Sequence, residues 1–212
     1  MKLLLHCCCA PCSIQCVKNL RGGNIEPVLF WYNPNIHPYT EYRSRLECLL
    51  KFAADEKLKL ETIDEYGLRL FLREVFPAIR GEELQAEGAG VTERCEICYR
   101  LRLEKAASFA ASEGYESFTT SLLISPYQDH DAIRRTGEFM AAKYGVDFLY
   151  RDFRPLFREG QTAARTLGFY MQKYCGCVFS EEERFLKKEK RKSLPRSFTE
   201  KDTEFHGVGE GK

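Results

Sequence analysis

Short apolar runs alternate along this chain with longer segments of helical periodicity. Runs typical of buried strands lie at residues 2–5, 26–32, 59–63, 117–120 and 146–150. Between them apolar side chains recur every three or four residues, and this spacing predicts helices. We expect the helices at residues 11–20, 39–56, 68–76, 96–112, 129–144 and 162–170, and a loop rich in Glu and Gly at 81–90. Strict alternation of this kind predicts an α/β fold with a mostly parallel sheet and helices on both faces.

The composition fits one domain and a short tail. Of 212 residues, 44% are hydrophobic, enough for a real core, and the formal net charge is only +1. We expect a single α/β catalytic domain over residues 1–186, and a basic helix end and flexible tail over 187–212. A basic run extends from Lys187 to Arg196, and it is equally compatible with a solvated helix end and with an RNA contact. A polyanion would have to bind a local patch, because the whole chain has almost no net charge.

The sequence predicts a cytoplasmic protein without a membrane segment. The apolar run at residues 1–5 ends at His6 and is too short for a signal peptide or a bilayer span. In the cytosol thiols are kept reduced and structural disulfides are rare. Clustered cysteines in such a protein therefore indicate metal binding or redox catalysis.

Most of the ten cysteines fall into three short motifs. These are Cys7-Cys8-Cys9-Ala10-Pro11-Cys12, then Cys95-Glu96-Ile97-Cys98, and finally Cys175-Gly176-Cys177. Packing does not require adjacent thiols, whereas four thiolates are the usual complement for a [4Fe–4S] cluster or a tetrahedral zinc ion. Neighbouring thiolates chelate one small zinc ion awkwardly but can reach different corners of a cubane. The two cysteines of the third motif are additional to the four thiolates that such a metal site needs. Their spacing suits a labile disulfide or a bent metal-binding loop.

The remaining cysteines have simpler interpretations. Cys16 follows Cys12 by one helical turn, and Cys48 lies among leucines, so both are expected to pack in the core. The side chain of Cys7 is ambiguous, because it could point into the fold, away from its neighbour Cys8.

Polar residues near the strand ends complete the predicted site. The carboxyl ends of parallel strands share one edge of a sheet, so the first cysteine motif and the loops that follow other strands should converge there. The candidate substrate-binding residues are Asn33, His37, Tyr99, Arg102 and Tyr127. His37 suits a proton donor or a phosphate contact, although a capping or exposed histidine is as compatible with the sequence. Asp64 could bind a metal or cap the following helix.

Five motifs, in order, closely resemble the epoxyqueuosine reductases of the QueH type. They are His6-Cys-Cys-Cys-Ala-Pro-Cys12, Phe30-Trp-Tyr-Asn-Pro-Asn-Ile-His-Pro38, Glu93-Arg-Cys-Glu-Ile-Cys-Tyr-Arg-Leu-Arg102, Thr119-Thr-Ser-Leu-Leu-Ile-Ser-Pro126 and Gln172-Lys-Tyr-Cys-Gly-Cys-Val-Phe-Ser180. The resemblance covers the chain from its start to about Ser180. The segment from Phe169 to Gln172 departs from the pattern, since it lacks an expected arginine beside the glutamine.

The resemblance implies an adenine-nucleotide-hydrolase-like fold (HUP or PP-loop-like) and the last step of queuosine synthesis. Epoxyqueuosine at the wobble position of a tRNA anticodon would be reduced to queuosine by two electrons, without cobalamin. The partners implied are this tRNA and an unidentified electron donor, and the oligomeric state stays open. By motif position, a [4Fe–4S] cluster would be held by Cys8, Cys9, Cys95 and Cys98. Cys175 and Cys177 would cycle between dithiol and disulfide, and Cys12 and Asp64 would bind an additional iron ion.

Two other functions compete with this one. A zinc-binding protein that modifies or binds tRNA without redox activity would use the same thiols. A nucleotide-activating pyrophosphatase would need a Gly/Ser-rich phosphate loop after the first strand, where this chain has cysteines. If the protein binds tRNA, whether as the reductase or as the zinc-binding protein, the candidate phosphate contacts are Arg43, Arg45, Arg100, Arg102 and the basic run.

Overall fold

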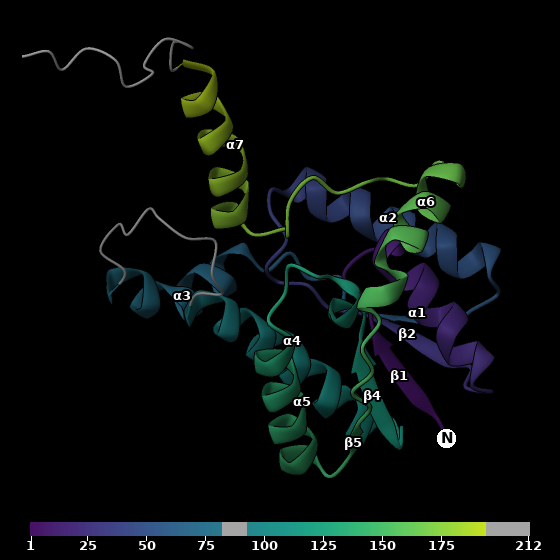
Figure 1. Ribbon diagram of the computed structural model, residues 1–212. Coiled ribbons are helices and arrows are strands. Elements are labelled where there is room, and N and C mark those ends of the chain that lie inside the picture. The colour runs from purple at the N-terminus through teal and green to yellow at the C-terminus, as the bar shows by residue number, and fades with distance from the viewer. Residues whose placement is uncertain (82–92, 194–212) are drawn as a thin grey trace, which may run out of the picture.

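A five-stranded parallel sheet forms the centre of the protein (Figure 1). The computed structural model describes residues 1–81 and 93–193. The strand order is β3-β2-β1-β4-β5. The strands are β1 (Leu3–His6), β2 (Pro27–Trp31), β3 (Leu60–Thr62), β4 (Ser117–Thr120) and β5 (Asp147–Phe148). The predicted α/β class and parallel sheet are therefore confirmed.

The central strand β1 is buried on both faces. Its leucines are fully buried, and Leu4 pairs in register with Val28 of β2 and Phe118 of β4. A strand that is covered by helices on both sides needs an apolar run rather than an alternating pattern. The short leucine run at the start of the sequence satisfies this requirement.

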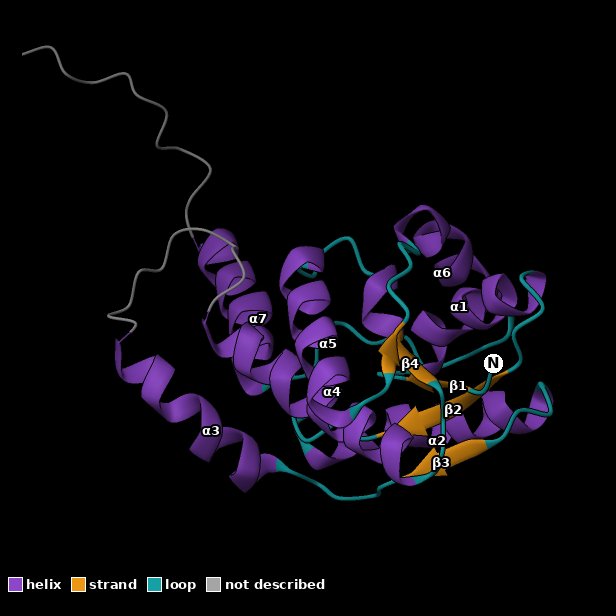
Figure 2. Ribbon diagram, turned by 90° about the horizontal axis from the view of Figure 1, so that it is seen from below, coloured by secondary structure: helices purple, strands orange, loops and turns teal. Residues whose placement is uncertain are grey.

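Helices cover both faces of the sheet (Figure 2). On one face lie α1 (Ala10–Gly22), α2 (Tyr39–Asp55) and α6 (Phe157–Thr166), and on the other lie α4 (Glu93–Ser112) and α5 (His130–Tyr144). Helix α6 packs closely on α1, because Gly160 and the buried Ala164 present almost no side chain to it. A Cβ atom added at Gly160 would lie 3.3 Å from the Gln15 side chain and 3.4 Å from the Pro11 carbonyl oxygen.

A second, smaller apolar cluster joins α3 (Leu68–Gly81) to the start of α7 (Val178–Ser193). Phe71 and Val75 of α3 are buried against Cys98 of α4, and Cys177 and Phe179 pack on the same cluster. The second and third cysteine motifs thus share a hydrophobic cover beyond the edge of the sheet.

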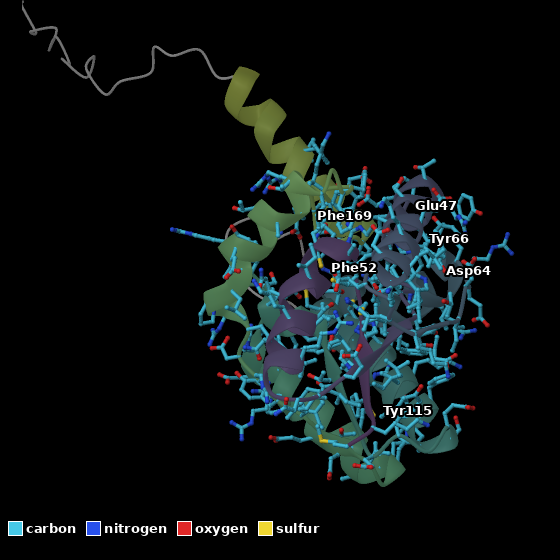
Figure 3. All side chains as sticks on the ribbon, turned by 90° about the vertical axis from the view of Figure 1, so that its right-hand side faces the viewer. Glu47, Phe52, Asp64, Tyr66, Tyr115 and Phe169 are labelled. Carbon is cyan, nitrogen blue, oxygen red and sulfur yellow. The ribbon has the colours of Figure 1, made fainter. Side chains whose placement is uncertain are left out.

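The helix expected at residues 162–170 was placed wrongly. Helix α6 spans Phe157–Thr166, and Gly168 then adopts a left-handed φ of 67°. A left-handed glycine after the last turn is a common helix terminator. The chain turns there, so that Phe169 packs edge-to-face on Phe52 of α2 at 6.1 Å between ring centroids (Figure 3).

Other boundaries touch the undescribed parts of the chain. The loop expected at 81–90 lies outside the described residues except for Gly81, which ends α3. Helix α7 continues past residue 186, the expected end of the catalytic domain. Within the described residues, no helix is long and apolar enough to cross a bilayer.

Candidate active site

The first cysteine motif lies where the strand order of the sheet reverses. Strands β1 and β4 are neighbours, and the connections after them run to opposite faces of the sheet, which opens a crevice beyond their carboxyl ends. Cys8 follows β1, and Ser121 begins the 3-10 helix η1 (Ser121–Ile124) that follows β4. The Ser121 hydroxyl accepts a hydrogen bond from the Cys8 backbone N–H at 3.1 Å, and its oxygen lies 3.5 Å from the Cys8 sulfur.

Three sulfurs of this motif form a buried group. The Sγ atoms of Cys8, Cys9 and Cys12 all lie within 4.8 Å of one another, and those of Cys8 and Cys9 are 3.7 Å apart. Cys9 precedes α1 in extended backbone, and Cys12 lies in the first turn, so the start of the helix brings the thiols together. Hydrogen bonds from the Cys12 and Cys9 thiols, with the charge of Arg102, hold the pKa of Cys8 well below its usual range. The group can therefore bind a metal.

The second motif contributes a buried thiol and a buried cation. Cys95 and Cys98 lie at the start of α4, and Arg102 follows one turn later, with Nη1 3.5 Å from the Cys98 sulfur. Burial raises the pKa of Cys98 to about 12, although Arg102 opposes this shift. Arg102 is only 1% exposed, and its Nε and Nη2 have no hydrogen-bond partner among the described residues.

Arg102 connects the three cysteine motifs electrostatically. Its guanidinium interacts with the thiols of Cys98, Cys8 and Cys175, one from each motif. A buried cation with free N–H groups favours negative charge nearby, because a buried charge is screened much less than an exposed one. One buried cation of α4 thus lies within electrostatic reach of all three cysteine motifs.

The third motif is held against the start of α2 by backbone hydrogen bonds. Arg45 donates to the carbonyl oxygens of Cys175 at 2.9 Å and Tyr174 at 3.0 Å. The His37 N–H donates to the Gly176 carbonyl at 2.7 Å, and the Tyr174 hydroxyl donates to the His37 carbonyl. Gly176 has a φ of 134°, a conformation that favours glycine.

The cysteines of the third motif are accessible. Cys175 is exposed, Cys177 is partly buried, and both are free thiols. Gln128, which follows η1, donates through Nε2 to the Cys175 sulfur at 3.7 Å and accepts from the Tyr99 hydroxyl at 2.8 Å. Tyr99 therefore orients the amide that contacts the exposed thiol.

A cavity of about 930 Å³ joins the first and third motifs. Cys8, Cys12 and Cys175 lie in its lining, with one face of α6 opposite. Its size suits a nucleoside. Of the predicted substrate contacts only Tyr127 lines this cavity; Asn33, His37, Tyr99 and Arg102 are buried around it.

Two of the buried residues support the loops of the site. Asn33 donates to the carbonyl oxygen of Cys7 at 2.9 Å, and His37 donates through Nε2 to that of Pro34 at 3.1 Å. Burial lowers the pKa of His37 to about 4, so the ring is neutral at physiological pH. Substrate contact by either residue stays a prediction.

Asp64 has other partners. Its carboxylate accepts hydrogen bonds at 2.9 Å from the Tyr42 hydroxyl and from Arg43, and its side chain is 49% exposed. Figure 3 shows it beside Tyr66 at one side of the molecule. A role for Asp64 as an iron ligand also stays a prediction, and it would require the carboxylate to leave these partners.

Some contacts of the site were not found from the sequence. Gln172 donates through Nε2 to the Cys12 sulfur at 3.3 Å, and its Oε1 is buried without a partner among the described residues. Three candidate phosphate contacts are already in ion pairs: Arg43 with Asp64, Arg45 with Glu41, and Arg100 with Glu74. The exposed cations that line the cavity are Arg158 and Arg165 of α6, Lys173 of the segment after it and Arg184 of α7. Helical spacing could have indicated the two arginines of α6 had the start of this helix been placed correctly.

Known proteins match nearly the whole chain. A model of the family described as "Epoxyqueuosine reductase QueH" matches residues 3–183. Epoxyqueuosine reductase QueH of Dehalococcoides mccartyi is 39% identical over 87% of this chain and 94% of that protein. Its counterpart of Thermotoga maritima is 37% identical over 86% of this chain and 91% of that protein.

A solved structure, described as a predicted subunit of tRNA methyltransferase from Methanocaldococcus jannaschii, has a TM-score of 0.49 and 13% identity, covering 89% of this chain and 88% of that one. The match to the family model, together with relatives this similar over most of their length, establishes one conclusion. The chain belongs to the epoxyqueuosine reductase QueH family.

Proposed function

We propose that this protein reduces epoxyqueuosine to queuosine at the wobble position of tRNA, with the reaction taking place in the cavity that joins the first and third cysteine motifs. Family membership supports the activity. The observation that carries the location is that one cavity has Cys8, Cys12 and Cys175 in its lining. Metal-capable thiols and an accessible dithiol are then within reach of the same bound nucleoside.

We infer that the thiols hold an iron–sulfur cluster, which the buried group of Cys8, Cys9 and Cys12 supports. Cys8, Cys9, Cys95 and Cys98 would hold a [4Fe–4S] cluster, and Cys12 would be free for an additional iron ion, with Asp64 as its second expected ligand. A cluster ligated by four thiolates is anionic. The buried guanidinium of Arg102, whose Nε and Nη2 have no hydrogen-bond partner among the described residues, would be a counter-charge for it. When bound, the cluster would supply single-electron transfer, and the additional iron ion would supply a Lewis acid.

The reaction balances with one dithiol. Oxidation of Cys175 and Cys177 to a disulfide releases two electrons and two protons. The epoxide consumes both electrons and both protons when its two C–O bonds break, which gives an alkene and one water. Each turnover then leaves a disulfide, so a two-electron donor must restore the dithiol before the next one. The exposure of Cys175 gives such a donor access.

The residues around the cavity have separate tasks. Gln128 fixes the Cys175 sulfur and Gln172 contacts the Cys12 sulfur, so both thiols are oriented towards the cavity. The wobble nucleoside must leave the anticodon stack to enter, as for other enzymes that modify a base. Its epoxide ring would then face the sulfurs, and the rest of the RNA would stay at the rim.

Anaerobic iron and sulfide analysis with a visible spectrum tests the cofactor. About four irons or slightly more per chain, with matching sulfide, would support the proposal. Colourless protein that carries zinc would refute the redox mechanism.

Cys175→Ser tests the division of labour among the thiols. We expect the cluster absorbance to remain and turnover of epoxyqueuosine-containing tRNA to disappear, because the serine hydroxyl cannot form a disulfide. The partly buried Cys48, outside the site, provides the control, and Cys48→Ser should retain both properties. Loss of absorbance in Cys175→Ser would instead make Cys175 a cluster ligand.

A further inference from the structure

We propose that four exposed cations at the rim of the cavity, Arg158, Arg165, Lys173 and Arg184, bind the phosphates of the anticodon loop that flank the target nucleotide. This inference rests on the proposed function and assigns its RNA-binding surface. All four line the cavity, and none belongs to the basic run that the sequence suggested for RNA contact.

Helix α6 presents a polar stripe to the cavity. Arg158, Thr162 and Arg165 follow one another at spacings of four and three residues, which places them on one face of a helix. The opposite face carries Gly160 and Ala164, which pack on α1. The packing of α6 therefore fixes the direction in which its arginines point. They lie about 10 Å apart along the helix axis, so they present charge along a line rather than at one point.

These cations differ from most of the surface arginines in their ion pairs. Among the side chains described, those of residues 1–78 and 93–186, no carboxylate pairs with any of the four, whereas Arg21, Arg43 and Arg100 each pair with two carboxylates. The carboxylate of Glu183, in the same lining, is paired with Arg94. The rim thus carries uncompensated positive charge around an opening that leads to the cysteines.

An aromatic side chain lies at the same opening. Tyr127 is 79% exposed, and its ring meets Phe157, the first residue of α6, edge-to-face at 6.0 Å between centroids. An exposed ring held at one edge is a surface on which a neighbouring base can stack. Phosphate-binding cations beside a stacking ring are the usual elements of a single-stranded RNA site, and an anticodon loop supplies such a strand.

The salt dependence of binding tests this surface. The probe is a fluorescent anticodon stem-loop without the epoxide, and its affinity is measured by anisotropy between 50 and 200 mM salt. Four phosphate contacts on a single strand predict a slope of log K against log salt of about −2.8, which is about a 50-fold loss over this range. Arg158→Gln with Arg165→Gln should reduce the slope to about −1.4, a loss of about 7-fold.

The control removes the same charge elsewhere. Lys57→Asn with Lys59→Gln, in the turn before β3 at the opposite edge of the sheet, should leave the slope unchanged. Tyr127→Ala should weaken binding at least about 5-fold without changing the slope, while Tyr127→Phe retains it. A wild-type slope in the α6 double variant, or an equal change in the lysine control, would overturn the proposal.

Turnover separates this inference from the proposed function. The wild-type protein could reduce epoxyqueuosine RNA while the α6 double variant shows an unchanged KM and an unchanged salt slope of binding. That result would refute the RNA-binding surface and leave the proposed function in place. If the wild type binds the stem-loop with the expected slope but reduces no epoxide, the surface stands and the function fails.

Discussion

Arg45 is expected to hold the redox motif in place, and its removal should be costly. Its side chain is 1% exposed and forms an ion pair with Glu41, itself 8% exposed, at 2.7 Å. The same guanidinium donates to the carbonyl oxygens of Cys175 and Tyr174. One side chain of α2 thus satisfies a buried carboxylate and fixes the backbone of the third cysteine motif.

The magnitude follows from what each substitution leaves behind. Arg45→Met leaves the Glu41 carboxylate buried, with the Tyr170 hydroxyl as its one remaining side-chain hydrogen-bond partner among the described residues. Breaking a buried ion pair in this way costs about 3–5 kcal/mol. Arg45→Met with Glu41→Gln removes both charges and retains an acceptor for Tyr170. The remaining cost is the loss of the two bonds to carbonyl oxygens, about 2 kcal/mol in total. The double variant should therefore be more stable than the single one by at least about 1 kcal/mol.

Urea unfolding, with anaerobically purified proteins compared side by side, measures both free energies of unfolding. Alkylation of native protein supplies a second measurement, because release of the loop should increase the reaction rate at Cys177, which is partly buried. A cost below about 1 kcal/mol for Arg45→Met would refute the reasoning. So would a double variant less stable than the single one.

Two further predictions concern the fold around the site. Gly67→Ala would place a Cβ atom 2.6 Å from the Cα of Pro34, so it should lower the free energy of unfolding by about 1–3 kcal/mol. Gly22→Ala is the control, because a Cβ atom there has nothing within 4 Å and should leave the free energy of unfolding unchanged. Equal effects of the two substitutions in urea unfolding would contradict this prediction. His37, whose pKa falls from 6.5 to about 4 on burial, binds its proton more readily in the unfolded chain, so stability should be lost as the pH falls from about 6.5 to about 4. Between pH 7 and pH 5 this residue should account for a loss of about 2 kcal/mol in the free energy of unfolding. His37→Phe should therefore reduce the pH dependence of the free energy of unfolding by that amount. An unchanged pH dependence would exclude His37 as its source.

The sequence predicted the elements whose signals are local. The apolar runs of β1 and β4 and the cysteine motifs are contiguous, so their type and place at the edge of the sheet followed from short segments. The start of α6 was missed, because its packing depends on Gly160 and Ala164, and neither adds to an apolar periodicity. A wrong start also hid the stripe of arginines on this helix.

The support of the third motif could not be predicted for a different reason. Arg45 and Cys175 are 130 residues apart in the sequence, and no spacing rule relates them. The sequence suggested Arg45 as a phosphate contact, since a lone arginine gives no indication of burial. Only the fold shows that its donors are used by a carboxylate and two carbonyl groups.

The placement of the thiols separates two requirements of the proposed chemistry. Metal ligands must be held in fixed positions, and Cys8, Cys9 and Cys12 are buried between the end of β1 and the first turn of α1. A dithiol must change the distance between its sulfurs when it is oxidised, and Cys175 lies on an exposed loop that is tethered through its backbone. Arg102 interacts with thiols of both groups, so a change of charge in one alters the electrostatic energy of the other. The buried thiols and the exposed thiol are therefore held by different contacts, and the charge of Arg102 acts on both.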